Sequence, residues 1–199
     1  MTYTNILNEL FRREGLDLEL IPGQETRING DFVEDLKNGD ILPLNDGEYV
    51  FVELPSDHVP RYTQQVLFDI QVAGFKPIIV HPERNQEIIE HPNQLYEFVK
   101  RGALTQVTAG SVIGKFGKTV QKISEQLINA NLTHFIASDA HNTTSRKFWM
   151  REALSHIRNE FGTDLEYIFL ENSQLLLDGF NVNRIEPSKI KKKKFFGLF

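Results

Sequence analysis

The chain has 199 residues, 40% of them apolar, which is enough for the core of one globular domain. It has no cysteine, so thiolate nucleophiles and zinc–cysteine sites are excluded. Its net charge is −5, but residues 186–199 hold five Lys against one Glu (+4), so the other 185 residues carry −9. Because nucleic-acid-binding proteins present a basic face, this acidic body argues against a nucleic-acid partner.

Helix-like and strand-like patterns alternate along almost the whole chain. In the first half of the chain we expect a helix at 3–14, a strand at 17–21, a short helix at 31–37, a strand at 49–54, a helix at 61–73 and a strand at 77–80. In the second half we expect a helix at 93–100, a strand at 103–107, a helix capped by Ser111 and running to about residue 129, a strand at 133–137 and helices at 149–161 and 172–177. This alternation indicates a parallel α/β fold. Five strands, each followed by a helix or loop, favour part of a (β/α) barrel over an open doubly wound sheet, and the nucleotide-binding glycine loops are absent.

Residues 1–185 are predicted to form the α/β domain and residues 186–199 a basic, aromatic tail. The tail combines its five Lys with three Phe. It is either a disordered, solubilising end or a segment that binds an anionic membrane surface. The chain has no 18-residue apolar run and no signal-peptide pattern, so we expect a cytoplasmic protein, peripheral to the inner face of the membrane if the tail binds there.

Acidic and histidine side chains recur where predicted strands end. These residues are Glu25, Glu53, His81, Asp139 and His141. Glu25, Glu53 and His81 are each 28 residues apart, about one β–α repeat, so they are expected on one rim of the fold. Mixed carboxylate and imidazole ligands suit Mn²⁺, Fe²⁺ or Zn²⁺, and a carboxylate such as Glu25 can bridge two ions.

Each of these residues alone has an ordinary explanation, because a single Glu near a strand end is more often a solvated loop residue. Asp139 and His141 are a stronger signal, since two types of metal ligand separated by a single residue at a strand end are uncommon. The combination of all five residues favours a metal site. We expect three of the remaining histidines to be structural: His91, His134 and His156. His58 lies in a predicted loop, and its role stays ambiguous.

Two arginines lie close in sequence to the predicted ligands. Arg84 is three residues after His81, and Arg146 is five residues after His141. Guanidinium groups bind phosphate oxygens in pairs, so beside metal ligands they indicate a phosphate ester substrate, although either one alone would more often be a surface ion-pair partner. Three further polar residues could orient the ligands: Asp57, Glu83 and Asn85.

Five segments together resemble a known family. They are P-G-Q-E-T-R-I (22–28), F-V-E-L-P-S-D-H-V-P-R-Y (51–62), V-H-P-E-R-N (80–85), T-A-G-S-V-I-G-K-F-G (108–117) and H-F-I-A-S-D-A-H-N (134–142). In this order they are similar to the PHP (polymerase and histidinol phosphatase) superfamily. Within it they resemble the manganese-dependent tyrosine-protein phosphatases of Gram-positive capsule and exopolysaccharide operons (CpsB/YwqE type).

The resemblance implies a distorted (β/α)7 barrel with two or three Mn²⁺ ions. It implies hydrolysis of phosphotyrosine on a cognate autophosphorylating bacterial tyrosine kinase that controls polysaccharide export. Carried over by position, Glu25 would bridge metals, Glu53 and His81 would complete one site, and Asp139 and His141 would serve a second and a third. Arg84 and Arg146 would hold the phosphoryl group, with Asp139 also in the catalytic set.

The chain departs from the family pattern at its beginning. The D-x-H-x-H and T-P-H-H segments that the family carries are absent, so the resemblance implies an N-terminally truncated barrel that lacks about the first quarter. Two alternatives to an active phosphatase therefore remain. One is a catalytically impaired remnant that binds the kinase or its phosphotyrosine without turnover; the other is a different PHP phosphomonoesterase, such as a histidinol phosphatase.

Overall fold

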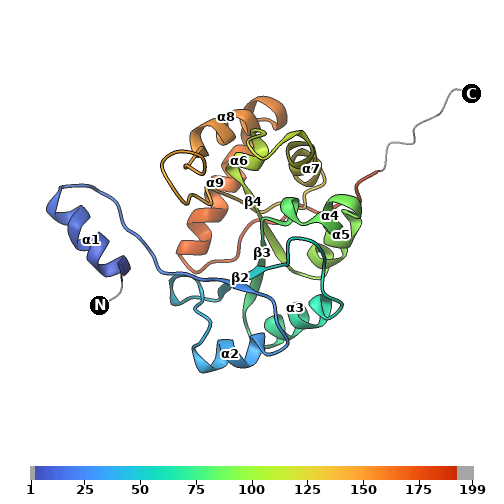
Figure 1. Ribbon diagram of the computed structural model, residues 1–199, viewed down its shortest axis with the longest axis horizontal. Coiled ribbons are helices and arrows are strands. Elements are labelled where there is room, and N and C mark those ends of the chain that lie inside the picture. The colour runs from blue at the N-terminus through green and yellow to red at the C-terminus, as the bar shows by residue number, and fades with distance from the viewer. Residues whose placement is uncertain (1–2, 192–199) are drawn as a thin grey trace, which may run out of the picture.

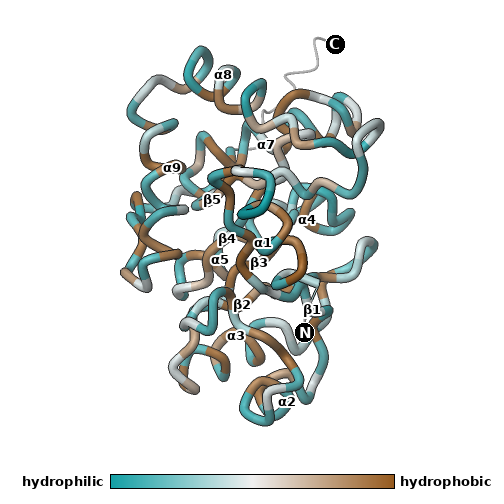
Figure 2. The backbone as a smooth tube through the Cα atoms, turned by 90° about the vertical axis from the view of Figure 1, so that its left-hand side faces the viewer, coloured by the Kyte–Doolittle hydropathy of each residue, from teal (hydrophilic) through white to brown (hydrophobic). Residues whose placement is uncertain are grey.

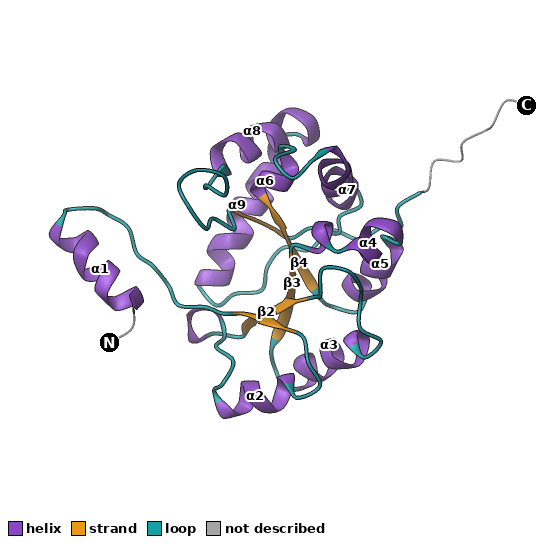
Figure 3. Cartoon of the chain, in the orientation of Figure 1, coloured by secondary structure: helices purple, strands orange, loops and turns teal. Residues whose placement is uncertain are grey.

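The computed structural model describes residues 3–191 and contains one parallel sheet flanked by helices (Figure 1, Figure 3). The strands are β1 (Glu25–Arg27), β2 (Tyr49–Glu53), β3 (Lys76–Val80), β4 (Leu104–Thr108) and β5 (Phe135–Ala137). The α-helices are α1 (Tyr3–Arg13), α2 (Phe32–Asn38), α3 (Thr63–Val72), α4 (Gln86–Glu90), α5 (Asn93–Lys100), α6 (Ala109–Val112), α7 (Lys118–Asn129), α8 (Met150–Phe161) and α9 (Thr163–Leu177). Two short 3₁₀ turns, η1 (Leu44–Asp46) and η2 (Pro82–Arg84), precede β2 and follow β3.

The strands follow one another across the sheet in sequence order, β1-β2-β3-β4-β5, and every neighbouring pair is parallel. A doubly wound sheet reverses its strand order at a switch point, and this sheet has no reversal among the described strands. The expected parallel α/β fold is therefore confirmed, and so are the strands expected at 49–54, 77–80, 103–107 and 133–137, within two residues at either end.

The two faces of the sheet bury different side chains because successive residues of a strand point to opposite sides. One face packs on the helices and contributes to the large core: Val50, Val52, Ile79, Val107 and Ile136. The other face carries a smaller cluster of Tyr49, Ile78, Leu104 and Phe135, covered by Val182 and the end of α9. Glu53 lies four residues after Tyr49, so its carboxylate projects on this second face, at the C-terminal end of β2.

Helix α1 stands apart from the other elements (Figure 1), and none of its residues is buried. The Asn8 side chain accepts a hydrogen bond from the Leu20 N–H (2.7 Å) and donates one to the Leu20 carbonyl (2.8 Å). The strand expected at 17–21 is therefore wrong, since these backbone groups bind a side chain rather than a neighbouring strand. The first strand forms instead at Glu25–Arg27, against β2, so Glu25 begins a strand rather than following one.

The helix expected at 111–129 is two helices, α6 and α7. Gly114 (φ 77°) and Gly117 (φ 96°) lie between them in the left-handed region, which glycine adopts without a steric penalty. Ser111 lies inside α6 rather than at a cap, and its hydroxyl donates to Glu83 Oε1 at 2.7 Å. Helix α9 begins at Thr163, nine residues before the expected start, and packs on α8.

The chain after α9 runs back across the helices. Asn172 of α9 exchanges hydrogen bonds with Asn183, the Ser188 N–H donates to the Ala130 carbonyl, and the Ile190 N–H donates to Asn93 Oδ1. Of the predicted tail, 186–199, the part up to residue 191 is thus bound to α5 and α7. Residues 192–199 lie outside the described residues.

His134 is buried just before β5, as its structural assignment requires. The Thr105 N–H donates to its Nδ1 (3.1 Å), and Asn172 Nδ2 donates to its carbonyl (3.0 Å). Burial, with a smaller effect of Arg184, lowers the pKa of His134 to about 3. The folded chain therefore holds a neutral imidazole at a pH where the unfolded chain protonates it.

This difference predicts a loss of stability in acid. Between about pH 6.5 and pH 3 the unfolded His134 binds a proton that the folded one does not, so acidification favours unfolding by up to about 1.4 kcal/mol per pH unit. In His134→Asn, whose Oδ1 can still accept from Thr105, the free energy of unfolding should fall less steeply over this range. Urea titrations from pH 7 to pH 4.5 measure the slopes, with exposed His91→Asn as the control. Equal slopes for wild type and His134→Asn would contradict the assignment.

Candidate active site

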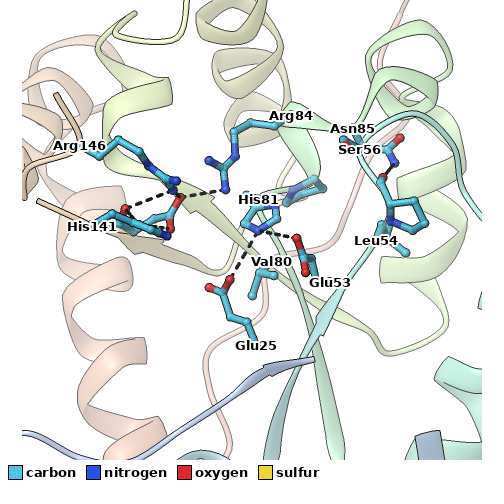
Figure 4. Close-up of a pocket in the computed structure, with 13 residues that line it drawn as sticks. Glu25, Glu53, Leu54, Ser56, Val80, His81, Arg84, Asn85, His141 and Arg146 are labelled. Atoms are coloured by element: carbon cyan, nitrogen blue, oxygen red, sulfur yellow. Dashed lines mark hydrogen bonds and ion pairs between the residues drawn. The ribbon is translucent and has the colours of Figure 1, made fainter. Parts of the chain in front are cut away.

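A cavity of about 320 Å³ opens at the C-terminal ends of the strands (Figure 4). Its lining includes all seven residues expected from the sequence: Glu25, Glu53, His81, Arg84, Asp139, His141 and Arg146. They come from β1, β2, η2 and the loops after β3 and β5, which are far apart in sequence. The parallel sheet brings the ends of β2, β3 and β5 to one edge, as the sequence pattern indicates, whereas Glu25 reaches the cavity from the start of the three-residue strand β1.

His81 is held directly after β3 in a strained backbone conformation. Its φ of 37° and ψ of 48° lie in the left-handed region, and its N–H donates to the Gln106 carbonyl at 2.8 Å. Asp139, after β5, has a φ of 48°. Such conformations cost on the order of 1–3 kcal/mol in a residue other than glycine and are concentrated at functional sites. Both side chains are thereby turned into the cavity.

Three donor atoms converge around His81. Its Nε2 lies 3.6 Å from Glu25 Oε2 and 3.9 Å from Glu53 Oε1 (Figure 4). The neighbouring His81 imidazole lowers the pKa of Glu25, and partial burial opposes this shift. Glu25 is thus held as a carboxylate.

The chemistry of these donors fits a divalent cation, but their spacing is wider than that of bound ligands. Ligands about 2.0–2.2 Å from one ion lie roughly 3–3.5 Å apart. Between residues 3 and 191, no group of three His, Asp or Glu side chains stands close enough together to hold an ion. The two His81 contacts exceed this spacing by a few tenths of an ångström at most.

Asp139 binds both arginines through one oxygen. Its Oδ2 forms an ion pair with Arg84 Nη2 at 2.8 Å and accepts a hydrogen bond from Arg146 Nη2 at 2.6 Å, and its side chain is 5% exposed. Two positive groups therefore meet at a single carboxylate oxygen on the wall of the cavity (Figure 4). His141 lies beside them, with its Nδ1 at 3.5 Å from Asp139 Oδ1.

Asn142 shapes the loop that carries Arg146, a role that the sequence analysis did not assign. Its Oδ1 accepts from the Arg146 N–H at 2.9 Å and from the Thr144 N–H at 3.0 Å. The N–H groups of His141 and Asn142 donate in turn to the Arg146 carbonyl. The loop closes on itself and turns the Arg146 guanidinium back to Asp139. The sequence did contain a signal for this turn, because the side chain of an Asn in a polar segment after a strand often forms a hydrogen bond with the backbone two residues further on.

Glu83 and Asn85, expected to orient ligands, instead fasten the segments around Arg84. Glu83 is fully buried, and its Oε1 accepts from the Thr108 N–H at 3.1 Å as well as from Ser111, while burial raises its pKa. Asn85 Nδ2 donates to the carbonyls of Pro55 and His58. These two side chains join η2 to β4, α6 and the loop after β2.

The other candidate residues lie away from the cavity wall. Asp57 pairs with His58 at 2.8 Å on the surface, and this pairing lowers the pKa of Asp57. Neither lines the cavity, and the same holds for His91 and His156. His156 of α8 is 3.3 Å from Glu125 of α7, a contact between helices that agrees with its structural assignment.

Comparison with known proteins identifies the family. The family model for capsular polysaccharide synthesis, CpsB/CapC, matches residues 1–178. The chain belongs to the CpsB/CapC family.

Relatives in this family are named as phosphatases. The chain is 46% identical over 193 residues to the tyrosine-protein phosphatase YwqE of Bacillus subtilis and 39% identical over 197 residues to the putative tyrosine-protein phosphatase CapC of Staphylococcus aureus. These matches cover 97% and 96% of this chain and 76% and 77% of the two relatives.

A solved structure shows the same fold. It comes from work on YwqE of Bacillus subtilis and CpsB of Streptococcus pneumoniae, which are described as metal-dependent tyrosine phosphatases, and it superimposes with a TM-score of 0.93 at 45% identity. The match covers 95% of this chain and 76% of the other. At this identity the parallel five-stranded sheet is a shared feature.

The shared Asp139 oxygen predicts how the site responds to phosphate. Asn tolerates the positive φ at residue 139, so Asp139→Asn mainly removes the negative charge between the two arginines. The free energy of unfolding should fall on the order of 2 kcal/mol. This is less than for a fully buried pair, because both guanidiniums are partly exposed. Phosphate should then raise the melting temperature more in the variant than in the wild type, because no carboxylate competes for the arginines. Thermal unfolding with and without phosphate, in the presence of a chelator, measures this.

Asp57→Asn is the matched control, since Asp57 carries the same charge outside the cavity, and its response to phosphate should equal that of the wild type. Equal phosphate-dependent shifts in Asp139→Asn and the wild type would contradict competition between Asp139 and phosphate.

Proposed function

We propose that the chain acts as a metal-dependent protein-tyrosine phosphatase, which hydrolyses phosphotyrosine on a cognate autophosphorylating bacterial tyrosine kinase and so regulates capsular or exopolysaccharide synthesis. The observation that carries the proposal is the paired guanidiniums of Arg84 and Arg146 beside the convergent Glu25, Glu53 and His81 donors. Membership of the CpsB/CapC family and the names of the relatives support it.

In this proposal Arg84 and Arg146 bind the phosphoryl group. Both direct an Nη2 group to one point, now held by Asp139 Oδ2, and a phosphoryl oxygen there would pair with both guanidiniums in the same way. Charge develops on the phosphoryl oxygens during transfer, so two fixed guanidiniums stabilise the transition state. Asp139 keeps the arginines oriented before the substrate arrives.

Glu25, Glu53 and His81 would hold one divalent cation, with Mn²⁺ proposed as the ion, and Asp139 and His141 would contribute to further positions when two or three ions are bound. Such a cation supplies Lewis-acid polarisation of the phosphoryl group and eases deprotonation of water. The residues themselves orient the phosphate ester and hold its charge. Hydrolysis adds water across the P–O bond, giving inorganic phosphate and the tyrosine hydroxyl, without a cysteine nucleophile.

The fold supports a finer assignment. A sheet whose parallel strands follow in sequence order, with a cavity at their C-terminal ends, is the arrangement of a β/α barrel. We assign residues 1–185 to part of a distorted (β/α)7 barrel of the PHP type and residues 186–199 to its C-terminal extension.

The same extension motivates a membrane-facing location. Lys189 pairs with Glu97 at 3.6 Å and lies over the Tyr96 ring, so the chain leaves the body near α5. The further Lys and Phe residues would follow from there to an anionic lipid surface at the cytoplasmic face. No helix within residues 3–191 has both the length and the apolar character that crossing a bilayer requires.

The phosphatase assignment predicts Mn²⁺-dependent release of phosphate from a phosphotyrosine peptide. His81→Ala removes the donor common to both close contacts, so it should lower bound metal and reduce turnover on the order of 100-fold or more. Metal content by mass spectrometry and phosphate release measure the two effects. His91→Ala, outside the cavity, should behave as the wild type.

Other outcomes separate the alternatives. Saturable binding of the peptide with no phosphate release by the metal-loaded wild type would favour a regulator that binds without turnover. Faster turnover of histidinol phosphate than of the peptide would favour another PHP phosphomonoesterase. Either result would overturn the proposed activity.

The extension predicts salt-sensitive binding to vesicles with anionic lipid. Each Lys near such a surface contributes about 1 kcal/mol at low salt, so replacing Lys192, Lys193 and Lys194 by Ser should abolish co-sedimentation. Vesicles of zwitterionic lipid are the control. Binding that is unaffected by salt, or absent at low salt, would argue against the membrane partner.

A further inference from the structure

An aromatic shelf extends from Arg84 along the top of α6. The Arg84 guanidinium lies over the Phe116 ring at 5.5 Å, and the Lys115 ammonium lies over the Trp149 ring at 5.7 Å. We use the term aromatic shelf for Phe116, Trp149 and the Gly110 backbone between them. Because Arg84 lines the cavity and also contacts this shelf, the two are continuous.

Gly110 lets the two rings lie close to the backbone of α6. A Cβ atom built on Gly110 would lie 2.9 Å from Phe116 Cε2 and 3.1 Å from Trp149 Cε3, closer than side chains normally pack. The absence of a side chain at residue 110 is therefore what allows both rings to lie over the same turn of α6. Gly110→Ala would push one or both rings away.

Unpaired positive charges surround the shelf. A hollow of about 430 Å³ next to Trp149 is lined by Lys147 and Arg151 against a single carboxylate, Glu152. Among residues 3–191, no carboxylate lies within ion-pair distance of Lys115, Lys147 or Arg151. In a chain of net charge −5, three cations without a partner on one face favour a negatively charged ligand.

Phe148 adds apolar surface to the same hollow. Its side chain is 68% exposed, although Trp149 beside it packs against the core. Packing of the folded chain therefore accounts for Trp149 but leaves Phe148 in water. Aromatic residues and arginine are enriched in protein–protein interfaces relative to the rest of the surface.

We propose that the aromatic shelf and the hollow beside it bind the acidic segment of the substrate chain that flanks the phosphotyrosine, and so select acidic tyrosine-containing peptides over isolated phosphotyrosine. This inference rests on the proposed phosphatase function. Phe116 and Trp149 contact apolar parts of the peptide, while Lys115, Lys147 and Arg151 pair with its carboxylates.

Trp149 is the single tryptophan of the chain, so its fluorescence reports directly on the shelf. An acidic phosphotyrosine peptide should shift or quench the emission in a saturable manner. Inorganic phosphate should protect the protein against thermal unfolding without a comparable change in emission. Binding is measured in the presence of a chelator, so that the peptide is not hydrolysed.

Charge reversal tests the positive side chains. Lys115→Glu and Lys147→Glu should each weaken binding of the acidic peptide by about tenfold, in a salt-dependent manner, while the affinity for inorganic phosphate falls much less. Lys37→Glu is the matched control, because Lys37 lies on α2 at the opposite end of the molecule from α8 (Figure 1). Gly110→Ala should weaken peptide binding without adding charge, and circular dichroism confirms that each variant is folded.

The outcomes separate this inference from the proposed function. Equal peptide affinities in Lys115→Glu, Lys147→Glu and Lys37→Glu, with no change in Trp149 emission, would overturn the shelf as a peptide site while phosphate binding and hydrolysis still stand. A wild type that binds neither phosphate nor the peptide would overturn both. Equal affinity for the acidic peptide and for a neutral phosphotyrosine peptide would also overturn the selection of acidic segments.

Discussion

Two guanidinium groups that share one carboxylate oxygen determine the character of this site. Arg84 and Arg146 come from loops more than 60 residues apart in the chain, and both are held at Asp139 Oδ2. Bringing two guanidinium cations together costs free energy because they repel each other. In the free protein the Asp139 carboxylate offsets this cost, and a bound phosphoryl group can replace the carboxylate in that role. The rest of the cavity is arranged around this pair, with Glu25, Glu53 and His81 on one side and the aromatic shelf on the other.

The backbone around the pair is built to keep it in place. Left-handed conformations at His81 and Asp139 are unfavourable in isolation, and the sheet hydrogen bonds and the closed Asn142 loop hold them. Four hydrogen bonds tie η2 to its neighbours: buried Glu83 accepts from the Thr108 N–H and the Ser111 hydroxyl, and the Asn85 side chain donates to the carbonyls of Pro55 and His58. Such support keeps the Arg84 guanidinium oriented before any ligand binds, which lowers the entropy lost on binding.

The sequence indicated the sheet and the composition of the site because both follow from local patterns. Short apolar runs ended in His81 and Asp139, and parallel strands necessarily gather such ends at one edge. The sequence did not predict the position of the first strand, because strand pairing there depends on residues distant in the chain. The segment at 17–21, which alternates acidic and apolar residues, resembles a strand as much as 25–27 does, and only the Asn8 contact and the register of Glu25 with Phe51 decide between them. The Asn142 loop and the break at Gly114 and Gly117 likewise depend on tertiary contacts.

The decisive measurement is a crystal structure of the chain with Mn²⁺ and inorganic phosphate. We expect a phosphate whose oxygens lie about 2.9 Å from the Nη atoms of both Arg84 and Arg146, with Asp139 Oδ2 released from at least one of them. We also expect an ion bound by Glu25, Glu53 and His81. Phosphate bound elsewhere, with both arginines still on Asp139 and no ion at His81, would contradict the proposed phosphate and metal sites.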